Sequence, residues 1–348
     1  MAGWDILFSI MTTYKAAQFG QKNGKLELVD KQIPKPGPGE VVVKMEACGV
    51  CHSDSFTEVG AYGNSFPRVP GHEIVGTVYD VGSDVPKEFK KGVRVGSGWN
   101  GGYCGQCKQC RCGNFSTCGE NFVNGITFDG GYQEYAILRQ EALCFVPDGM
   151  DPAEAAPLLC AGITVYNSMR HVDHIMPGDM CVVKGIGGLG HLAIQFSNKF
   201  GYKTVAVSSG SKKKDLAMKL GTHEYIDSSA ENAVDKIQKM GGAKMIVVTA
   251  IGGDVEGMVN ALGLDGTMLI VAVITEPVKV NTLHLLQCRA AVKGWLSGSA
   301  CDSQDCLNFA QLTQCRPMIQ KYPLKDAQKA YDAMMKGEAR FRSVLVFE

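Results

Sequence analysis

The chain has 348 residues, of which 45% are hydrophobic and 20% charged, so it is long enough to bury a sizeable core and to form two domains. Lysine plus arginine and aspartate plus glutamate both number 35, and a chain without net charge has no overall positive field to hold a nucleic acid or an anionic membrane. No run of about 20 apolar residues is present, which argues against a membrane-spanning helix. We therefore expect a soluble, cytoplasmic protein with no nucleic-acid or membrane partner.

The amino-terminal residues and the cysteines bear on the compartment. MAGWDILFSI contains an apolar stretch but lacks the basic start and the cleavage site of a signal peptide, and we interpret it as an appendage before Met11. Fourteen cysteines in a chain without a signal peptide favour a reduced compartment. In such a compartment cysteines serve as metal ligands, catalytic thiolates or small buried side chains.

The pattern of predicted elements changes near Cys160. Before it, strand-like runs separated by Gly, Pro and Asp turns predict a mostly antiparallel β domain. These runs occupy residues 40–50, 73–82 and 131–138. After it, strand-like runs alternate with helix-like stretches, which predicts a doubly wound parallel sheet and, for the whole chain, the α/β class. The later strands occupy residues 180–185, 204–209, 245–250 and 267–273. From about Trp295 the sequence predicts two helices and a closing strand.

Five cysteines lie within the polar stretch YCGQCKQCRCGNFSTC. Cys104, Cys107 and Cys110 are each separated by two residues, and Cys118 follows after a loop, a spacing that lets four thiolates bind one structural zinc ion. Cys112 breaks the even spacing and is predicted not to be a ligand. A cluster of free thiols or a redox site is the alternative.

A zinc ribbon in a nucleic-acid-binding protein is the rival class for this lobe. Such a module needs a basic surface lined with aromatic side chains, and the lobe has only two basic residues, Lys108 and Arg111. A structural protein built on the scaffold of an inactive enzyme is a further alternative. Such a protein would have lost a catalytic metal ligand or Ser53, and this chain retains all of them.

A second set of candidate metal ligands is dispersed along the chain. Cys51 lies in CGVCHSD, His72 and Glu73 in GHE, and Cys160 in LLCAGIT. Two thiolates and an imidazole from three loops would leave one coordination position open, which is the composition of a catalytic zinc site. Taken singly, each has another interpretation, because a cysteine is often a small buried side chain and a histidine is often structural.

The stretch KGIGGLGHLAIQF indicates a dinucleotide site. Gly185, Gly187 and Gly190 fall between a predicted strand and a predicted helix, where glycines permit a tight turn and close approach of a pyrophosphate. A glycine-rich turn without a ligand is the alternative.

Along the chain these motifs follow the order CGVCHSD, GHE, the four-cysteine lobe, LLCAGIT and GIGGLG. The motifs and their order resemble those of the zinc-dependent medium-chain alcohol dehydrogenases, and the resemblance covers the chain from about Tyr14 to Phe347. It implies a GroES-like, mostly antiparallel catalytic domain with a Rossmann domain inserted before its final segment. The corresponding boundaries are residues 1–161 for the catalytic domain with its zinc lobe at 99–119, 162–295 for the Rossmann domain, and 296–348 for the segment that returns to the catalytic domain.

The resemblance also implies roles for individual residues. Cys51, His72 and Cys160 match the catalytic zinc ligands, and Glu73 matches a nearby acid that can approach the metal. Asp54 matches the carboxylate that orients the histidine. Ser53 matches the hydroxyl that takes the proton of the alcohol. The positions that match cofactor contacts are His52, Thr164, Gly185, Gly187, Gly188, Leu189, Gly190, Ser208, Ser209, Ser211, Lys213, Val273 and Arg342. Among these, Thr164 lies at the nicotinamide, and His52 and Arg342 hold the pyrophosphate.

One departure from the family concerns the proton. Many relatives have a histidine a few residues after the serine that passes the proton to solvent, and this chain has Phe56 there. The proton must then leave through the ribose hydroxyls, through water or elsewhere.

The substrate is less strongly encoded. Trp99 matches a bulky pocket residue of relatives that act on primary alcohols, although core packing is its other interpretation. Further predicted walls of the pocket are Tyr62, Phe66 and Val273. The alternative function is that of a polyol dehydrogenase of the sorbitol type.

The cofactor preference depends on the residues after the strand 204–209. An NAD-selective site has an acid there that binds the ribose hydroxyls and repels a 2′-phosphate, and this chain has Ser209. The following Ser211 and the lysines 212–214 can supply hydroxyl donors and positive charge. This arrangement resembles the NADP-using cinnamyl alcohol dehydrogenases, so NADP is expected, with NAD as the alternative.

The resemblance further implies two zinc ions per chain and a homo-oligomer. A homotetramer or a homodimer is expected, joined through an edge of the Rossmann sheet near residues 267–273.

Overall fold

The computed structural model describes residues 13–120, 122–250, 254–274 and 276–348. The predicted appendage, residues 1–10, lies outside the described residues. All 14 cysteines are described and none forms a disulfide. Within the described residues, no helix has the length and apolar character needed to cross a membrane.

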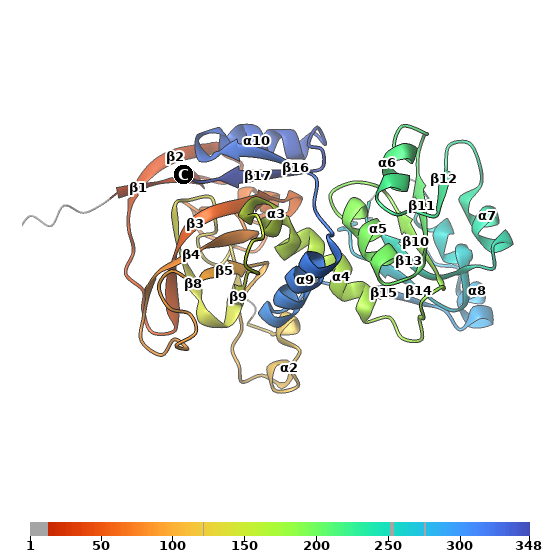
Figure 1. The fold of residues 1–348 in the computed structure, drawn as a ribbon, viewed down its shortest axis with the longest axis horizontal. Coiled ribbons are helices and arrows are strands. Elements are labelled where there is room, and N and C mark those ends of the chain that lie inside the picture. The colour runs from red at the N-terminus through yellow and green to blue at the C-terminus, as the bar shows by residue number, and fades with distance from the viewer. Residues whose placement is uncertain (1–12, 121, 251–253, 275) are drawn as a thin grey trace, which may run out of the picture.

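The first half of the chain and its carboxyl-terminal segment together form a seven-stranded, mostly antiparallel sheet with the order β16-β17-β3-β4-β5-β9, and β8 pairs with β3 (Figure 1). The long strand β3 is buried along most of its length, as expected for the centre of a sheet. Its members are β3 (Glu40–Val50), β4 (Ile74–Val81), β5 (Arg94–Ser97), β8 (Tyr135–Arg139), β9 (Cys144–Phe145), β16 (Ile319–Pro323) and β17 (Arg342–Val346). Two hairpin-like pairs accompany it, β1 (Thr13–Phe19) with β2 (Leu26–Gln32) and β6 (Asn100–Gly102) with β7 (Phe122–Val123).

The second sheet is parallel throughout and has the order β12-β11-β10-β13-β14-β15. Its strands are β10 (Met180–Lys184), β11 (Lys203–Ser208), β12 (Glu224–Asp227), β13 (Ala243–Val248), β14 (Leu262–Ile270) and β15 (Ala291–Gly294), and its helices are α5 (Gly190–Lys199), α6 (Lys214–Lys219), α7 (Ala233–Lys239) and α8 (Thr282–Cys288). Numbered from β10, this is the Rossmann order 3-2-1-4-5-6, in which a ligand binds where the order reverses, at the carboxyl ends of β10 and β13. The predicted α/β class and its Rossmann sheet are confirmed.

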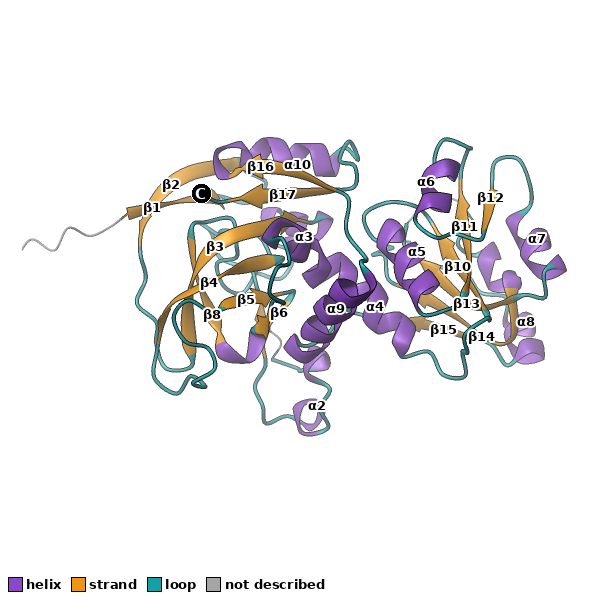
Figure 2. Cartoon of the chain, viewed as in Figure 1, coloured by secondary structure: helices purple, strands orange, loops and turns teal. Residues whose placement is uncertain are grey.

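Three helices lie between the two sheets in Figure 2: α3 (Pro152–Pro157), α4 (Ile163–Arg170) and α9 (Ala300–Thr313). One buried cluster includes Ala47 and Val75 of the first sheet together with Val183 and Leu269 of the second. Because the sheets share this core through the intervening helices, side chains from both can be held at fixed positions near their junction.

The carboxyl-terminal segment returns to the first sheet. Helix α10 (Ala327–Met335) packs near β17, and β17 pairs antiparallel with β3, although the two are about 300 residues apart in sequence (Figure 1). The predicted two helices and closing strand are present, but the sequence analysis missed β16, which precedes α10. The exact domain boundaries stay predictions.

The prediction that residues 267–273 form an edge of the Rossmann sheet is wrong. They overlap β14, which lies between β13 and β15, and the edge strand on this side of the sheet is β15. The error has a physical cause, because a continuous apolar run is typical of a strand covered on both sides, whereas AVKG in β15 is short, carries a lysine and has no buried residue. Oligomerisation stays a prediction; the helix that precedes β15 in sequence, α8, exposes Leu283 and Leu286.

Candidate metal and cofactor site

Four donor side chains from distant parts of the chain meet beside the first sheet. Cys51 follows the end of β3, His72 and Glu73 immediately precede β4, and Cys160 lies on a π-helical turn, Leu158–Gly162, between α3 and α4. Their ligand atoms all lie within 4.8 Å of one another, and the sulfurs of Cys51 and Cys160 are 3.8 Å apart. Single π turns in helices are frequent at functional sites, and this one carries a side chain of the cluster.

The imidazole of His72 is fixed on one side and open on the other. Its Nδ1 lies 2.9 Å from Oδ1 of Asp54, and Oδ2 of Asp54 accepts hydrogen bonds from the Cys51 amide (2.9 Å) and the Tyr132 hydroxyl (2.8 Å). The Nε2 of His72 is buried and has no hydrogen-bond partner. A buried polar atom without a partner is unfavourable, so Nε2 needs a ligand that the protein chain does not supply.

The charges of the cluster favour a cation. The hydrogen bond from Cys160 lowers the pKa of Cys51 well below its ordinary value and so favours a thiolate. Burial lowers the pKa of His72, but the neighbouring Asp54 carboxylate and Cys51 sulfur outweigh it, so the pKa of His72 is raised. Burial raises the pKa of Glu73 to about 7, against the opposing effect of the Arg342 guanidinium.

Glu73 forms a buried ion pair with Arg342, through its Oε1 and the Nη2 of the arginine. Its other oxygen, Oε2, is buried without a partner, and one of the two carboxylate oxygens belongs to the donor cluster. The carboxylate lies so close to the backbone of β3 that a Cβ at Gly49 would overlap Oε2, so only glycine leaves room for it there. The sequence analysis assigned Arg342 to the cofactor, and the structure pairs it with the metal cluster as well.

A zinc ion fits this cluster. Tetrahedral zinc with zinc–sulfur bonds of about 2.3 Å holds two sulfurs about 3.8 Å apart, which is the separation of Cys51 and Cys160. His72 Nε2 would be the third ligand, and Glu73 stands beside the remaining position. Two cysteines, one histidine and an open position form a set known for catalytic zinc.

The cysteine lobe forms a second cluster. The sulfurs of Cys104, Cys107, Cys110 and Cys118 lie within 4.8 Å of one another, and four of the six pairs are separated by 3.5 to 4.0 Å. Backbone amides donate to three of these sulfurs, as expected for groups that carry negative charge. Cys112 is exposed and lies outside the cluster. The arrangement matches a closed structural zinc site with four thiolates.

The glycine turn lies at the reversal point of the parallel sheet. Gly185 follows β10 with a φ of 96°, which favours glycine, and its Cα faces Ala250 after β13 so closely that an added Cβ would be 2.6 Å away. A Cβ at Gly187 would meet nothing within 4 Å, so this side of the turn is open. Helix α5 begins at Gly190, after Leu189, and presents its amino terminus to that side, which suits a pyrophosphate.

Arg342 also reaches the glycine turn. Its Nη1 lies 3.0 Å from the position that a Cβ of Gly188 would occupy. The guanidinium therefore lies between the donor cluster and the turn, and the metal and cofactor candidates form a single site.

The loop that would meet the cofactor's adenosine ribose follows β11. Ser208 ends the strand, and Ser209 and Ser211 are exposed. Lys213 donates a hydrogen bond from Nζ to the carbonyl of Ile186, 2.8 Å away, so this lysine lies against the glycine turn. Burial, together with the charge of Arg340, lowers the pKa of Lys213.

The remaining predicted site residues lie in different surroundings. Ser53 is half-buried on the short 3₁₀ turn His52–Asp54, next to Cys51, while His52 is exposed. Thr164 is buried on α4, just after the π turn. Val273 lies in the loop after β14 and is 58% exposed.

Aromatic side chains stand beside the donor cluster. Trp99 is buried and meets the His72 ring edge-on at 5.0 Å, and Phe56 and Tyr62 pack edge-on against Trp99 at 6.4 and 6.3 Å. Phe66, which is predicted to line the same pocket, is partly buried and packs against the core of the first sheet. The group formed by Trp99, Phe56 and Tyr62 is called the aromatic wall below.

Comparison with known proteins agrees with this geometry. Residues 37–148 match the family described as "Alcohol dehydrogenase GroES-like domain", and residues 188–314 match "Zinc-binding dehydrogenase". The alcohol dehydrogenase patD of Penicillium expansum is 44% identical over 335 residues, which cover 96% of this chain and 98% of the relative. The chain belongs to the zinc-dependent medium-chain alcohol dehydrogenases. It is an oxidoreductase that acts on alcohols, as the sequence analysis predicted.

Solved structures of two proteins share the fold of this dehydrogenase. A cinnamyl alcohol dehydrogenase from Sorghum bicolor superimposes with a TM-score of 0.86 at 29% identity, covering 96% of this chain and 98% of the other. The acetophenone reductase of Geotrichum candidum, in complex with NAD, gives a TM-score of 0.83 at 27% identity and covers 96% and 97% of the two chains. The GroES-like domain of the predicted fold is thereby confirmed.

Sequence reasoning missed several residues of this dehydrogenase site. Tyr132 holds Asp54 from a distant loop, and Phe56, noted only as a missing histidine, belongs to the aromatic wall. Val123 and Ile126 pack in the same small cluster as Trp99. No local pattern marks Tyr132, because its role depends on a contact 78 residues away along the chain.

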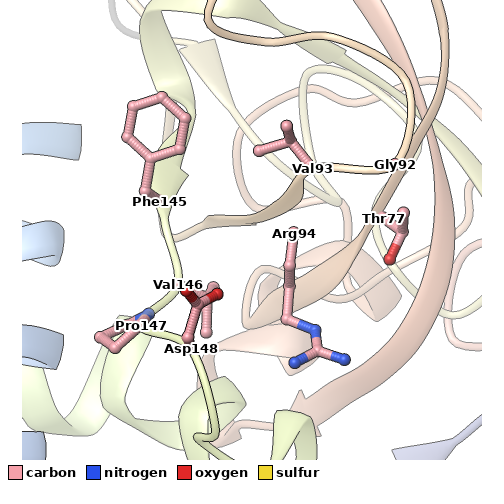
Figure 3. Close-up of a pocket in the computed structure, with 8 residues that line it drawn as sticks. All are labelled: Thr77, Gly92, Val93, Arg94, Phe145, Val146, Pro147 and Asp148. Atoms are coloured by element: carbon pink, nitrogen blue, oxygen red, sulfur yellow. The ribbon is translucent and has the colours of Figure 1, made fainter.

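A surface hollow of the dehydrogenase lies away from these residues. Figure 3 shows a pocket of about 630 Å³ lined by residues of β4, β5 and the segment around β9, including Arg94, Phe145 and Asp148. None of the predicted site residues lines it, so the candidate site rests on the donor cluster and not on pocket size.

The cysteine lobe is predicted to stabilise the fold. Cys107→Ser should remove one zinc ion and lower the free energy of unfolding markedly, because structural zinc sites contribute on the order of 10 kcal/mol. Thermal melting and metal analysis measure both effects. Cys112→Ser is the control and should keep the melting temperature and metal content; a wild-type result for Cys107→Ser would contradict the structural zinc site.

Asp54 is predicted to orient His72 for the metal. Asp54→Asn should weaken zinc binding at the donor cluster of Cys51, His72 and Cys160 by roughly 10- to 100-fold, because carboxylates that hydrogen-bond a metal-ligating histidine have effects of this size. Competition with a chelator measures the affinity. Tyr132→Phe removes only the hydroxyl that supports Asp54 and should have a smaller effect; equal zinc affinity in Asp54→Asn and wild type would show that the His72 orientation does not depend on this contact.

Proposed function

We propose that the enzyme catalyses reversible hydride transfer between a primary alcohol, aliphatic or aromatic, and NADP, acting in reverse as an aldehyde reductase. The observation that carries this proposal is the unpartnered, buried Nε2 of His72 in a cluster with two thiols and a carboxylate. A metal site with an open position would give this nitrogen a partner and would place the substrate beside the adjacent aromatic wall.

The residues in and around the donor cluster have different roles in the proposed reaction. Zinc held by Cys51, His72 and Cys160 would supply Lewis acidity toward the substrate's oxygen. Ser53, half-buried beside Cys51, is placed to take the proton of the alcohol hydroxyl as its own hydroxyl hydrogen passes on to water or a ribose hydroxyl. A nicotinamide cofactor would supply the acceptor for the hydride that leaves the alcohol carbon. Phe56 lies in the aromatic wall, so no imidazole at this position takes the proton onward from Ser53.

The aromatic wall supports the primary-alcohol assignment. Trp99 is 7% exposed and packs against a metal-ligand candidate, so a second carbon substituent on the reacting carbon would have to displace its ring. Tyr62, by contrast, is 62% exposed and stands at the outer end of the wall, where a long or flat aromatic substrate can extend. The cinnamyl alcohol dehydrogenase fold supports the same class, while the acetophenone reductase favours the alternative of a ketone or secondary alcohol.

Trp99 is predicted to exclude branched substrates. The purified enzyme, assayed by nicotinamide absorbance at saturating cofactor, should turn over ethanol, benzyl alcohol and cinnamaldehyde in preference to sorbitol and acetophenone. Trp99→Leu should raise kcat/KM for the secondary substrates by about tenfold relative to the primary ones, which corresponds to removing roughly 1.4 kcal/mol of steric cost.

Phe145→Leu provides the matched control, because Phe145 lies at the remote hollow of Figure 3 and should leave the substrate ratio unchanged. A wild type that prefers sorbitol or acetophenone would overturn the primary-alcohol proposal. No turnover with any substrate and either cofactor would overturn the proposed activity altogether.

Two features of the β11 loop support NADP. Ser209 stands where an acid would repel a 2′-phosphate, and the exposed Lys212 and Lys214 flank Lys213, whose ammonium already lies against the glycine turn. The nearby Asp227 carboxylate is engaged by the amides of Gly210 and Ser229. NAD stays the alternative cofactor, since it is the ligand of the acetophenone reductase.

The cofactor ratio is predicted to follow these charges. Lys213→Ala should lower kcat/KM for NADP by about tenfold with little change for NAD, because it removes one charge-assisted hydrogen bond. Ser209→Asp should reverse the preference through repulsion of the phosphate. Lys219→Ala changes the net charge equally at the far end of α6 and should keep the ratio; a wild type that favours NAD would contradict the NADP proposal.

A further inference from the structure

Two side chains of helix α5 bind the chain segment that returns to the first sheet. His191 and Gln195 are four residues apart and therefore lie on one face of the helix. Gln195 donates from Nε2 to the carbonyl of Arg316 and accepts the Arg316 amide at Oε1, both at 3.0 Å. Nε2 of His191 lies 3.1 Å from the Met318 amide. The two side chains thus pair with alternate residues of the segment, as a neighbouring strand would.

The tautomer of His191 follows from its partners. The Met318 amide can only donate, so Nε2 accepts and Nδ1 carries the hydrogen. Nδ1 then donates to the carbonyl of Gly187, 2.8 Å away. Burial lowers the pKa of His191 to about 4, so the ring stays neutral and keeps both bonds at neutral pH. Phe341 stacks on the ring at a centroid distance of 5.1 Å.

The Gly187 carbonyl belongs to the open part of the glycine turn. It accepts the His191 amide at 3.1 Å as well as the imidazole, so its direction is fixed by two donors of one residue. In a trans peptide the amide N–H points opposite to the carbonyl, so fixing the Gly187 carbonyl toward α5 directs the Gly188 amide away from the helix. The side of Gly187 that an added Cβ would enter is empty within 4 Å.

The same segment is joined to the strand that carries Arg342. The Met318 carbonyl accepts the amides of Phe341 and Arg342 at 2.9 and 3.0 Å. His191 therefore contacts, on one side, the turn proposed to bind the cofactor and, on the other, the segment whose Met318 is hydrogen-bonded to the backbone of Arg342.

We propose that His191 is a positioning residue for the dinucleotide: its Nδ1 holds the Gly187–Gly188 peptide in the orientation that donates an amide to the pyrophosphate, and its Nε2 fixes that turn to the returning segment. This inference rests on the proposed cofactor site at the glycine turn.

Two substitutions of His191 each remove one of its two hydrogen bonds, to the Gly187 carbonyl or from the Met318 amide. Asparagine places its amide nitrogen near the position of Nδ1 and can still donate to Gly187, whereas glutamine places its amide oxygen near Nε2 and can still accept from Met318. His191→Gln should raise the Kd of NADP by roughly three- to tenfold, the usual worth of one hydrogen bond, and His191→Asn should stay within about twofold of wild type. Calorimetric titration of the zinc-loaded protein with NADP gives Kd, and at saturating NADP kcat should be unchanged in both variants.

Gln195→Ala is the control, because it loosens the same segment without touching the glycine turn. It should lower the melting temperature and leave the Kd of NADP unchanged. Wild-type affinity in His191→Gln, or a loss of affinity that parallels the melting temperature across all three variants, would overturn the positioning role. If the wild-type protein bound neither NADP nor NAD, the proposed function itself would fail. The two failures can be told apart, because the first is seen in the His191 variants and the second in the wild type.

Discussion

The buried ion pair of Glu73 and Arg342 is the interaction on which the site's geometry depends. Glu73 is fully buried and Arg342 is 5% exposed, and a charge in such surroundings requires a partner. Glu73 belongs to the donor cluster at the start of β4, and Arg342 begins β17 with its guanidinium against Gly188. Loss of either partner would leave an uncompensated buried charge, at a cost of about 3–5 kcal/mol. The pair therefore holds the metal donors at a fixed position relative to the cofactor turn.

The two cysteine-containing clusters differ in how the fold forms them. The lobe draws its four thiols from a single short loop, so its own backbone amides and a metal can organise it locally. The other cluster needs β3, β4 and the π turn to be in place first, since its side chains come from residues far apart in sequence. A local cluster stabilises structure, whereas a dispersed one depends on the structure already formed, and this difference suits a structural role for the first and a catalytic role for the second.

Much of the fold and the donor sets could be predicted because their signals are local. The strand at residues 40–50 coincides with β3, and the Gly185 to Gly190 pattern predicted both the turn and the helix that follows it. The cysteine spacing likewise singled out the four thiols that the structure brings together. Periodicity, glycine placement and ligand spacing all report on residues close in sequence.

The parts that could not be predicted depend on long-range contacts. The Tyr132 hydroxyl on Asp54, the pairing of Arg342 with Glu73 and the link from His191 to Met318 join residues 78, 269 and 127 positions apart. The edge of the Rossmann sheet was misassigned because hydrophobicity marks the buried strands and not the outermost one. Phe66 was placed in the pocket by analogy, and its core packing became visible only in three dimensions.

The central claim is that the donor cluster and the glycine turn form one zinc and nicotinamide site. A crystal structure of the protein with zinc and NADP, recorded at the zinc absorption edge, tests it most directly. The account predicts an anomalous peak within bonding distance of Cys51 Sγ, His72 Nε2 and Cys160 Sγ, a second among the four lobe cysteines, and the pyrophosphate at Gly187 and Gly188. The absence of zinc at His72, or a cofactor bound away from the glycine turn, would contradict it.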